Sequence, residues 1–353
     1  MTDLSRHPGL RLIEASGPGT ASPSAPGARY VVSGSVQRLS DTLRINIRLI
    51  DAETKQQLWS ARFERPFGDL FTVQDEIIRK LTDVLPGQLS DAARERLAKR
   101  YTSSLEAYDH FLRGQALFLV RQPRQNEEAR ERYRMALELD PKFARAYAGL
   151  AMTYAIDFRL RESGDRDAAL TRAFELAETA RLIDPDIPEV HWALGFVHTQ
   201  NRRHEEALRS LRRAIELNRS FADGYALMGG IYTYIGEPAK AIPLVRTAMQ
   251  LNPGSGYLYF LVLGRAYLFE NDIEQALINL REAVTRNPAD LETRVFLAAA
   301  MVAAGNVGAA EWEAEEIRSL AGGFELRRWL QTYPLTHARH TEKLVGLLAQ
   351  AGL

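Results

Sequence analysis

The sequence predicts a mainly α-helical protein of the α+β class, in which stacked helical hairpins follow a small antiparallel sheet. Two observations predict the helical part: small residues recur at an interval of 34 residues, as from Gly195 to Gly229, and prolines end several of the units. A third observation predicts the sheet, because apolar and polar residues alternate from Leu43 to Leu49. A fixed period of this size is typical of stacked supersecondary units rather than of one globular core.

The composition excludes several classes of protein. With 353 residues, the chain is long enough for two or more domains. Lys and Arg together number 45, as do Asp and Glu, and this formal net charge of +0 argues against bulk attraction to nucleic acid or an anionic membrane. The absence of cysteine excludes disulfides, thiolate metal sites and a cysteine nucleophile, and fits a reducing compartment. We therefore expect a cytoplasmic protein without a cofactor and without direct contact to nucleic acid.

No segment of the sequence reads as a membrane span. The first residues are polar and include Pro8, unlike a signal peptide. The most membrane-like stretch, Val295–Ala310, is shorter than the ~20 apolar residues that a span needs, and Gly305 and Asn306 interrupt it. It also falls in register with the repeats, so we predict a buried repeat helix there.

Residues 1–86 are predicted to form the small α+β domain. Leu10–Ile13 reads as a short strand, and Gly17–Gly27, dense in Gly, Pro, Ser and Ala, as a loop. Three further strands are expected at Tyr30–Leu39, around Leu43–Leu49 and at Leu58–Glu64. Short turn sequences separate these three strands and predict an antiparallel meander.

A helix is predicted to complete this domain. It covers Leu70–Leu85 and places Val73, Ile77, Ile78 and Leu81 on one face, and Pro86-Gly87 ends it. Residues 87–103 then form a connector that contains a charged helix, Ser90–Arg100.

Each repeat unit is predicted to be a pair of helices. In the third unit, the first helix covers Pro188–Gln200 and the second His204–Asn218. Small residues stand where two helices approach to ~8–10 Å. Gly195 supplies this on the first helix and Ala207 on the second, while Ala214 faces the next unit.

The array is predicted to cover residues 104–322, with five clear repeats and a weak sixth one at Asp290–Gly322. In repeat two, a long turn at Asp157–Asp167 separates the helices. In residues 323–353, two closing helices are expected around Leu326–Leu330 and Leu344–Leu348, where they would cap the exposed end of the array.

The small-residue, aromatic and proline positions resemble those of the tetratricopeptide repeat (TPR), in order, over most of Tyr101–Phe324. The resemblance implies a right-handed superhelix. It also implies that the inner face, lined by the first helix of each pair, receives a partner polypeptide.

The amino-terminal part has a resemblance of its own. Tyr30–Val36, Ile47–Asp51, Leu58-Trp59 and Phe71–Leu81 resemble a TolB-like domain. In bacterial proteins that domain often precedes TPR units, behind a class III adenylate cyclase domain or a winged-helix DNA-binding domain. Arg328–Leu353 resembles the end of such proteins.

The sequence departs from the TolB-like pattern at its start. The family's domain begins with a further strand and helix, most of which this sequence lacks, and Gly17–Gly27 stands where a helix usually runs. We therefore expect a sheet edge with unpaired backbone groups. There are two alternatives. Either a partner covers that edge, and this partner could be a second copy of the chain in a homo-oligomer, or the domain is a degenerate or truncated copy.

No constellation of residues points to catalysis. The sequence contains no phosphate-binding loop, dinucleotide fingerprint or nucleophile elbow, so we expect no enzymatic activity. His191, His198 and His204 are spaced closely enough to suggest a metal site, but no carboxylate or cysteine completes the set. His198 also stands at a packing position, so structural roles are favoured. His337 and His340 are expected at the surface.

Three arginine pairs could contact phosphates: Arg202-Arg203, Arg212-Arg213 and Arg327-Arg328. Glutamates beside them favour solvated, ion-paired faces instead.

The TPR resemblance places the partner-binding residues on the first helices, beside the packing positions. By register these are Phe111, Gln115, Phe118, Met152, Ile156, Trp192, Phe196, Gln200, Tyr234, Leu261, Arg265, Leu268 and Phe269. The set is aromatic and apolar with a single cation, so we expect an apolar or amphipathic peptide or helix as the ligand rather than a terminal carboxylate. Alternatively, several of these residues pack against a neighbouring helix or the TolB-like domain.

Two functions follow. The leading hypothesis is a non-catalytic scaffold or regulatory module that binds a protein or peptide partner in the TPR groove. The alternative is the regulatory part of an adenylate or guanylate cyclase, or of a winged-helix transcriptional regulator, whose catalytic or DNA-binding domain is absent from this sequence.

Overall fold

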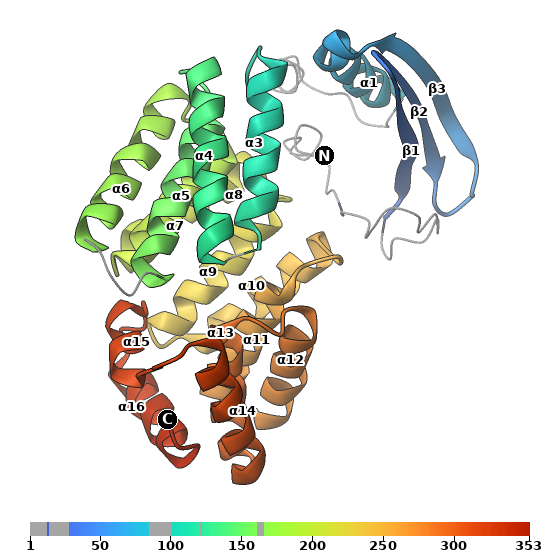
Figure 1. The fold of residues 1–353 in the computed structure, drawn as a ribbon. Coiled ribbons are helices and arrows are strands. Elements are labelled where there is room, and N and C mark those ends of the chain that lie inside the picture. Colours follow the sequence, from blue (N-terminus) through green and yellow to red (C-terminus); the bar gives the residue numbers. More distant parts are fainter. Residues whose placement is uncertain (1–12, 14–27, 85–100, 121, 161–165) are drawn as a thin grey trace. The chain divides into compact units, whose positions relative to one another are not determined.

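A computed structural model describes residues 13, 28–84, 101–120, 122–160 and 166–353 (Figure 1). The chain divides into two compact units, one with the amino-terminal sheet and one with most of the helical array. The predicted loop Gly17–Gly27 and connector helix Ser90–Arg100 lie outside the described residues. So does the predicted strand Leu10–Ile13 except for Ile13, which is not in a strand.

The sheet has three antiparallel strands in the order β1-β2-β3, which confirms the predicted meander. The strands are β1 (Tyr30–Leu39), β2 (Thr42–Asp51) and β3 (Gln57–Pro66). The turn between β1 and β2 places Ser40 at a φ of 53°, in the left-handed region that short polar residues tolerate best after glycine.

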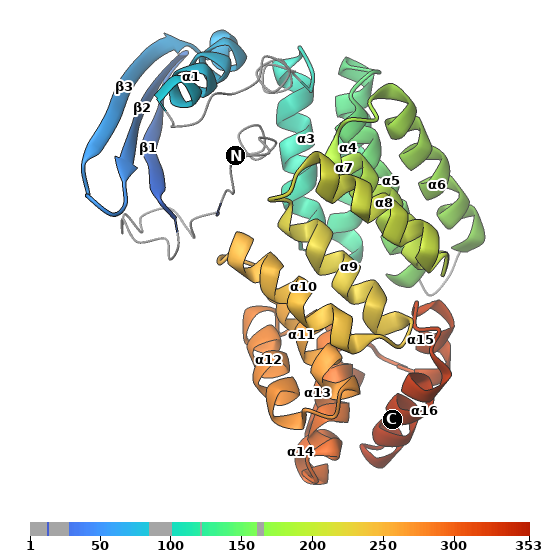
Figure 2. The ribbon, with the colours of Figure 1, turned by 180° about the vertical axis from the view of Figure 1, so that it is seen from behind.

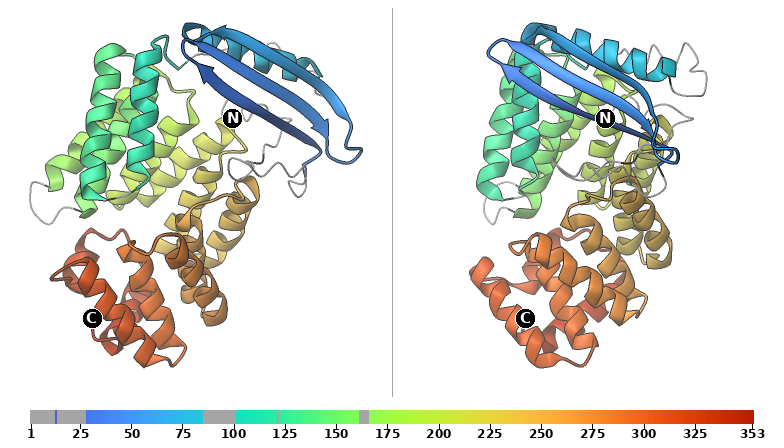
Figure 3. Two further views of the ribbon diagram at one scale, coloured as in Figure 1. Left: turned by 45° about the vertical axis from the view of Figure 1, so that its right-hand side comes forward. Right: turned by 90° about the vertical axis from the view of Figure 1, so that its right-hand side faces the viewer.

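One helix covers one face of this sheet. After a short turn, η2 (Phe67–Asp69), α1 (Leu70–Val84) lies along the face, as Figure 3 shows. The alternation in β2 points Leu43, Ile45 and Leu49 into the core, where Ile45 is opposite Phe63. The predicted helix and strand face are therefore confirmed.

Strand β1 is an edge of the sheet within the described residues. Its Val32 and Val36 lie opposite the buried Leu49 and Ile45, yet are 45% and 67% exposed. Pairing of this edge with a partner or a second copy stays a prediction.

The array consists of six helix pairs in the described residues, and its hairpins follow one another along the chain (Figures 1 and 2). The pairs are α3 (Leu105–Phe118) with α4 (Pro123–Leu139), α5 (Ala144–Leu160) with α6 (Arg166–Ile183), α7 (Pro188–Gln200) with α8 (His204–Leu217), α9 (Ala222–Tyr234) with α10 (Pro238–Leu251), α11 (Tyr257–Phe269) with α12 (Ile273–Arg286), and α13 (Leu291–Ala303) with α14 (Val307–Leu320). The helices expected for the third repeat are confirmed. The membrane-like stretch Val295–Ala310 comprises most of α13, the turn after it and the first residues of α14. A helix long and apolar enough to cross a membrane is not found in the described part of the chain.

The repeated glycines are the contact points inside the hairpins. A Cβ added to Gly195, Gly229 or Gly264 would lie 2.8, 2.7 or 2.6 Å from a branched side chain of the second helix. Ala207, which lies opposite Gly195, and Ala214, which is predicted to face the next unit, are both fully buried. The 34-residue period therefore marks close helix contact, as the sequence predicts.

The turn inside each of the last four pairs contains one residue in the left-handed region. These residues are Arg202, Gly236, Asn271 and Gly305. A left-handed residue after the last helical turn is a common way to end a helix, and glycine fits it best. Arg202, at a φ of 56°, carries a backbone penalty of about 1 kcal/mol there.

The predicted long turn of repeat two is wrong at its first end, because α5 continues to Leu160. Asp157 is held on the helix by an ion pair with Arg130 and by the Nδ2 of Asn126, which donates to Asp157 Oδ1 over 2.7 Å. These partners lie on α4 and stabilise the last turns of α5. Arg159 is therefore a helical residue.

Two helices follow the array, α15 (Leu326–Thr332) and α16 (Ala338–Gln350), as the sequence predicts. We call residues 326–353 the C-terminal segment. Helix α16 packs against α13, the first helix of repeat six. The segment therefore contacts the first helices of the array and does not only cap its last hairpin.

Candidate functional site

The first helices of the pairs, α3, α5, α7, α9, α11 and α13, form what we call the A-helix face. Neighbouring first helices contact one another, for example α5 with α7 and α9 with α11. Of the partner-binding residues predicted by register, only Gln115 and Trp192 are half-buried. Eleven are buried: Phe111, Phe118, Met152, Ile156, Phe196, Gln200, Tyr234, Leu261, Arg265, Leu268 and Phe269. Much of this face is therefore already covered by the protein itself.

The C-terminal segment covers the part of the A-helix face formed by the later repeats. The main-chain N–H groups of Thr336 and His337 both donate to the carbonyl oxygen of Tyr234, over 3.0 and 3.1 Å. The guanidinium of Arg202 donates to three main-chain carbonyl oxygens, those of residues 330, 331 and 333, over 3.1, 2.9 and 3.0 Å. These contacts involve the backbone of the segment and so do not depend on its side chains.

Aromatic rings fix the segment on both sides of this backbone. The ring of His340 stacks on Phe269 with 4.1 Å between ring centroids and 5° between planes. Trp329 stacks on Tyr333 at 4.2 Å, and Phe296 lies 5.9 Å from the same tyrosine. Stacked and tilted pairs at these distances stabilise by ~0.5–1.5 kcal/mol beyond their buried area.

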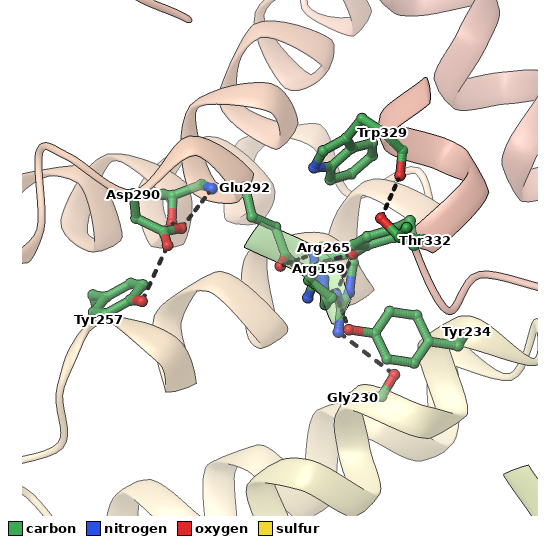
Figure 4. Close-up of polar contacts among 11 residues, drawn as sticks. Arg159, Gly230, Tyr234, Tyr257, Arg265, Asp290, Glu292, Trp329 and Thr332 are labelled. Atoms are coloured by element: carbon green, nitrogen blue, oxygen red, sulfur yellow. Dashed lines mark hydrogen bonds and ion pairs between the residues drawn. The ribbon is translucent and has the colours of Figure 1, made fainter. Parts of the chain in front are cut away.

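A buried polar cluster lies at the centre of this contact (Figure 4). The Nη1 of Arg265 donates to the Oη of Tyr234 over 3.0 Å, to Glu292 Oε1 over 2.9 Å, and to the Oη of Tyr333. The Oη of Tyr333 in turn donates to Glu292 Oε1 over 2.8 Å. Arg159, from repeat two, pairs with the other carboxylate oxygen of Glu292 over 3.0 Å.

The groups of the cluster keep one another ionised although they are buried. Burial alone would lower the pKa of Arg265, but the hydroxyls of Tyr234 and Tyr333 and the carboxylate of Glu292 raise it above its ordinary value. Burial alone would raise the pKa of Glu292, but the two arginines hold it below its ordinary value. Burial raises the pKa of Tyr333, so its hydroxyl keeps its proton. The cluster therefore contains two cations, Arg159 and Arg265, one anion, Glu292, and the protonated hydroxyl of Tyr333.

Sequence reasoning found only part of this site. Register found Tyr234 and Arg265. Glu292, the second residue of α13, lies outside the helix positions that the register used, so it was missed. Arg159 was missed because its helix was predicted to end at Asp157. Arg202 is exposed, as predicted, but the ion-paired role expected for it is wrong, because its guanidinium donates to main-chain carbonyl oxygens of the C-terminal segment.

The histidine predictions had different outcomes. The surface position predicted for His337 and His340 is wrong, because both are half-buried and His340 lies on Phe269. His198 packs edge-on against Phe174, with 5.5 Å between centroids, as expected for a packing position. His191 Nε2 lies 2.6 Å from the carbonyl oxygen of Pro185. In the described residues no cluster of His, Asp or Glu has the form of a metal site.

In the first three repeats, two of the predicted partner-binding residues, Gln115 and Trp192, are only half-buried. Trp192 is half-buried, stacks on Phe196 at 6.3 Å between centroids, and donates its Nε1 proton to the carbonyl oxygen of Asp223 over 3.2 Å. Beside it, Arg145 and Glu189 form an ion pair of 3.1 Å between neighbouring first helices. This part of the face therefore contains a half-buried tryptophan and an ion pair.

Comparison with curated proteins gives two relatives. Putative adenylate cyclase 3 of Rhizobium meliloti (strain 1021) is 33% identical over 216 residues, which are 59% of this chain and 37% of the relative. The cell division cycle protein 27 homolog of Caenorhabditis elegans is 33% identical over 101 residues, 29% of this chain and 13% of the relative. The chain therefore spans little more than a third of the first relative's length.

Comparison with solved structures finds proteins that share the fold of the helical array. The APC/C hetero-tetramer Cut9–Hcn1 aligns with a TM-score of 0.50 and 17% identity, covering 75% of this chain and 54% of that one. A thermophilic TPR protein of Thermus thermophilus aligns with a TM-score of 0.45 and 21% identity over 56% of this chain and 99% of its own. A family model described as a tetratricopeptide repeat matches residues 188–221 and 258–290. The hairpins at residues 188–221 (α7 with α8) and 258–290 (α11 with α12) are therefore identified as tetratricopeptide repeats.

Proposed function

We propose that the chain is a non-catalytic scaffold whose A-helix face binds a polypeptide partner. The observation that carries this proposal is the C-terminal segment, a stretch of polypeptide held by its main chain at Tyr234, the last residue of α9, and at Arg202, in the turn that follows α7. A surface that binds one chain by its backbone is suited to bind another, since the backbone groups are common to all sequences.

The partner surface we propose is the part of the A-helix face in the first three repeats, centred on Trp192. The half-buried indole offers a large apolar contact with one polar edge, a residue type enriched where proteins bind each other. The neighbouring Phe196, Gln200 and Gln115 lie on the same face by register. An apolar or amphipathic segment is the ligand that this surface favours.

Substitution at the tryptophan tests the proposal. Trp192→Ala with Phe196→Ala should abolish capture of the partner, measured by affinity capture of the tagged chain and quantitative mass spectrometry. Because Phe196 is only 7% exposed, its loss also weakens the hairpin, and Trp192→Ala alone serves as the milder variant. Circular dichroism of both variants checks that the repeats remain folded.

A matched control is available on the second helix of repeat six. Trp312 on α14 is 58% exposed and does not belong to the A-helix face. Trp312→Ala should capture the same proteins as the unaltered chain. If both Trp192 variants do so as well, this part of the face is not the partner site.

The relative from Rhizobium meliloti favours a second function, a regulatory role toward a nucleotide cyclase. We propose that the chain acts on a cyclase catalytic domain that this sequence does not contain. Purified chain added to that putative adenylate cyclase should change the rate of cyclic AMP formation. An unchanged rate over a wide range of chain concentrations would count against this role, and a cyclase or winged-helix reading frame directly upstream would favour a regulatory function of this kind.

A further inference from the structure

One tyrosine is held in a polar site on the A-helix face, and the way it is held shows what the site selects. We propose that the site formed by Arg265, Glu292 and Tyr234 recognises a tyrosine followed by an extended stretch of polypeptide. The chain's own Tyr333–His337 occupies this site as an intramolecular ligand, and a partner segment of the same chemistry displaces it. This rests on the proposed function, a polypeptide-binding A-helix face.

The site recognises the tyrosine hydroxyl in both of its hydrogen-bonding roles. The Oη of Tyr333 donates to Glu292 Oε1 over 2.8 Å and accepts from Arg265 Nη1. Arg265 is 1% exposed and Tyr333 is fully buried, so water cannot replace a missing hydroxyl. A site built to bond a hydroxyl rejects the analogue without it strongly, because its own polar groups are left unpaired.

The ring of the tyrosine is recognised as well. The Tyr234 ring meets it edge-on at 5.4 Å between centroids, and the guanidinium of Arg159 lies 5.1 Å from its centre. Cations over an aromatic face and edge-to-face rings both favour an aromatic side chain over an aliphatic one. Of the other aromatic side chains, phenylalanine fits this space but brings no hydroxyl.

The residues after the tyrosine are recognised by their backbone. Residues 333–337 belong to neither a helix nor a strand, and the N–H groups of Thr336 and His337 meet the Tyr234 carbonyl oxygen. Pro334 has no N–H to satisfy, and Leu335 is buried at 7% exposure. The site therefore takes a tyrosine, then an extended stretch with an apolar residue two positions later.

The intramolecular ligand is joined to the array by a short connection that allows exchange. Exposed Gly322 and Gly323 follow α14, and Gly323 has a φ of 80°. A ligand tethered this closely is present at an effective concentration in the millimolar range, of order 1 mM. A free segment therefore binds well only when the tethered one is weakened.

Binding of a peptide to the full chain tests the site. The probe is a fluorescent synthetic peptide with the sequence of residues 326–340, followed by fluorescence anisotropy. The full chain with Tyr333→Phe, which keeps the ring and removes the hydroxyl, should bind this peptide at least tenfold more tightly than the unaltered chain. The double variant Tyr333→Ala with Leu335→Ala should bind it more tightly still.

Two controls make the result specific. Gln331→Ala removes an exposed side chain but keeps the carbonyl that Arg202 binds, so it should behave like the unaltered chain. A peptide with phenylalanine in place of its tyrosine should bind the double variant at least tenfold more weakly. Equal affinities of the two peptides, or no binding to either Tyr333 variant while circular dichroism shows them folded, would overturn the tyrosine site.

The occupant and the proposed function are tested separately. If light scattering shows the unaltered chain to be a dimer that Tyr333→Ala dissociates, the occupant is the segment of a second copy, and displacement by a different partner is overturned. If partner capture depends on Trp192 but the peptide never binds, the scaffold function stands and only the tyrosine site falls. If the peptide binds but capture does not depend on Trp192, the tyrosine site stands and the partner surface at Trp192 falls.

Discussion

At the scale of single residues, Glu292 joins distant parts of the helical array. Its carboxylate receives Arg159 from repeat two and Arg265 from repeat five, together with the hydroxyl of Tyr333. Its side chain is 15% exposed, so water screens these interactions only in part. Removing one partner of a buried ion pair leaves the other charge uncompensated, which costs more than the pair contributes.

Glu292→Gln should therefore lower the free energy of unfolding by about 3 kcal/mol, the low end of the range for a broken buried pair. The remaining exposure of the carboxylate is the reason for choosing the low end. Denaturant unfolding followed by circular dichroism measures the change. Glu216→Gln, in an exposed pair with Arg213, should cost less than about 1 kcal/mol. A similar loss in both variants would show that the cluster is not a stabilising centre.

A second residue-scale prediction concerns pH. Burial and the nearby His337 lower the pKa of His340 to about 4, from an ordinary value of 6.5. The folded chain therefore keeps His340 neutral while the unfolded chain takes up a proton as the pH falls below about 6.5. The contribution of His340 to stability is present above that pH and is lost as the pH falls toward about 4.

His340→Phe keeps a ring to stack on Phe269 but cannot be protonated. The variant should lose less stability than the unaltered chain between about pH 6.5 and 4, the window set by the two pKa values. Thermal melts across this range measure the difference. Parallel pH profiles in the two proteins would mean that other groups, such as His204, account for the acid sensitivity.

At the scale of the element, the hairpins depend on glycine where two helices meet. A Cβ on Gly264 would lie 2.6 Å from Leu280 Cγ and 3.1 Å from the backbone nitrogen of Leu280. The leucine side chain can turn away, but the backbone can do so only if the helices separate.

Gly264→Ala should therefore destabilise the chain by about 1–3 kcal/mol, the usual cost of overpacking a core. Gly308→Ala is the matched control, because Gly308 lies in α14 with no neighbouring atom within 4 Å of its Cβ position. There alanine meets no neighbouring atom, so the substitution should change the free energy of unfolding by less than about 0.5 kcal/mol. Chemical denaturation measures the free energy of unfolding of both variants. Equal changes in the two variants would contradict the close helix contact at Gly264.

At the scale of the whole molecule, Arg159 connects repeats that are distant in sequence. Repeat arrays are usually held together by contacts between neighbours, so each part can unfold by itself. Here the Arg159–Glu292 pair joins α5 to α13, and the C-terminal segment contacts residues from repeats two to six. These contacts should make the array unfold as one unit.

Arg159→Ala should separate the two ends of the array. Amide exchange at increasing denaturant should give coincident midpoints for α5 and α13 in the unaltered chain, and a lower midpoint for α13 in the variant. Arg172→Ala, which removes an exposed cation paired within α6, should leave the midpoints together. If α5 and α13 already unfold separately in the unaltered chain, the long-range pair does not couple them.

The sequence by itself determined the elements of the described residues. Period, alternation and turn residues predicted three strands, the helix after them and the paired helices of the array, because these signals act within about 34 residues of chain. They also predicted which glycines lie at helix contacts, since such contacts join the two helices of one hairpin.

Only the tertiary structure decided what covers the A-helix face. The partners of Arg265 and Arg202 include Tyr333, 68 and 131 residues further along the chain, and no local pattern specifies a pairing over such distances. Arg159 and Glu292, 133 residues apart, meet because stacking of the intervening repeats brings them together. A local period specifies how one hairpin packs on the next, whereas the sum of many such steps fixes which distant residues come into contact.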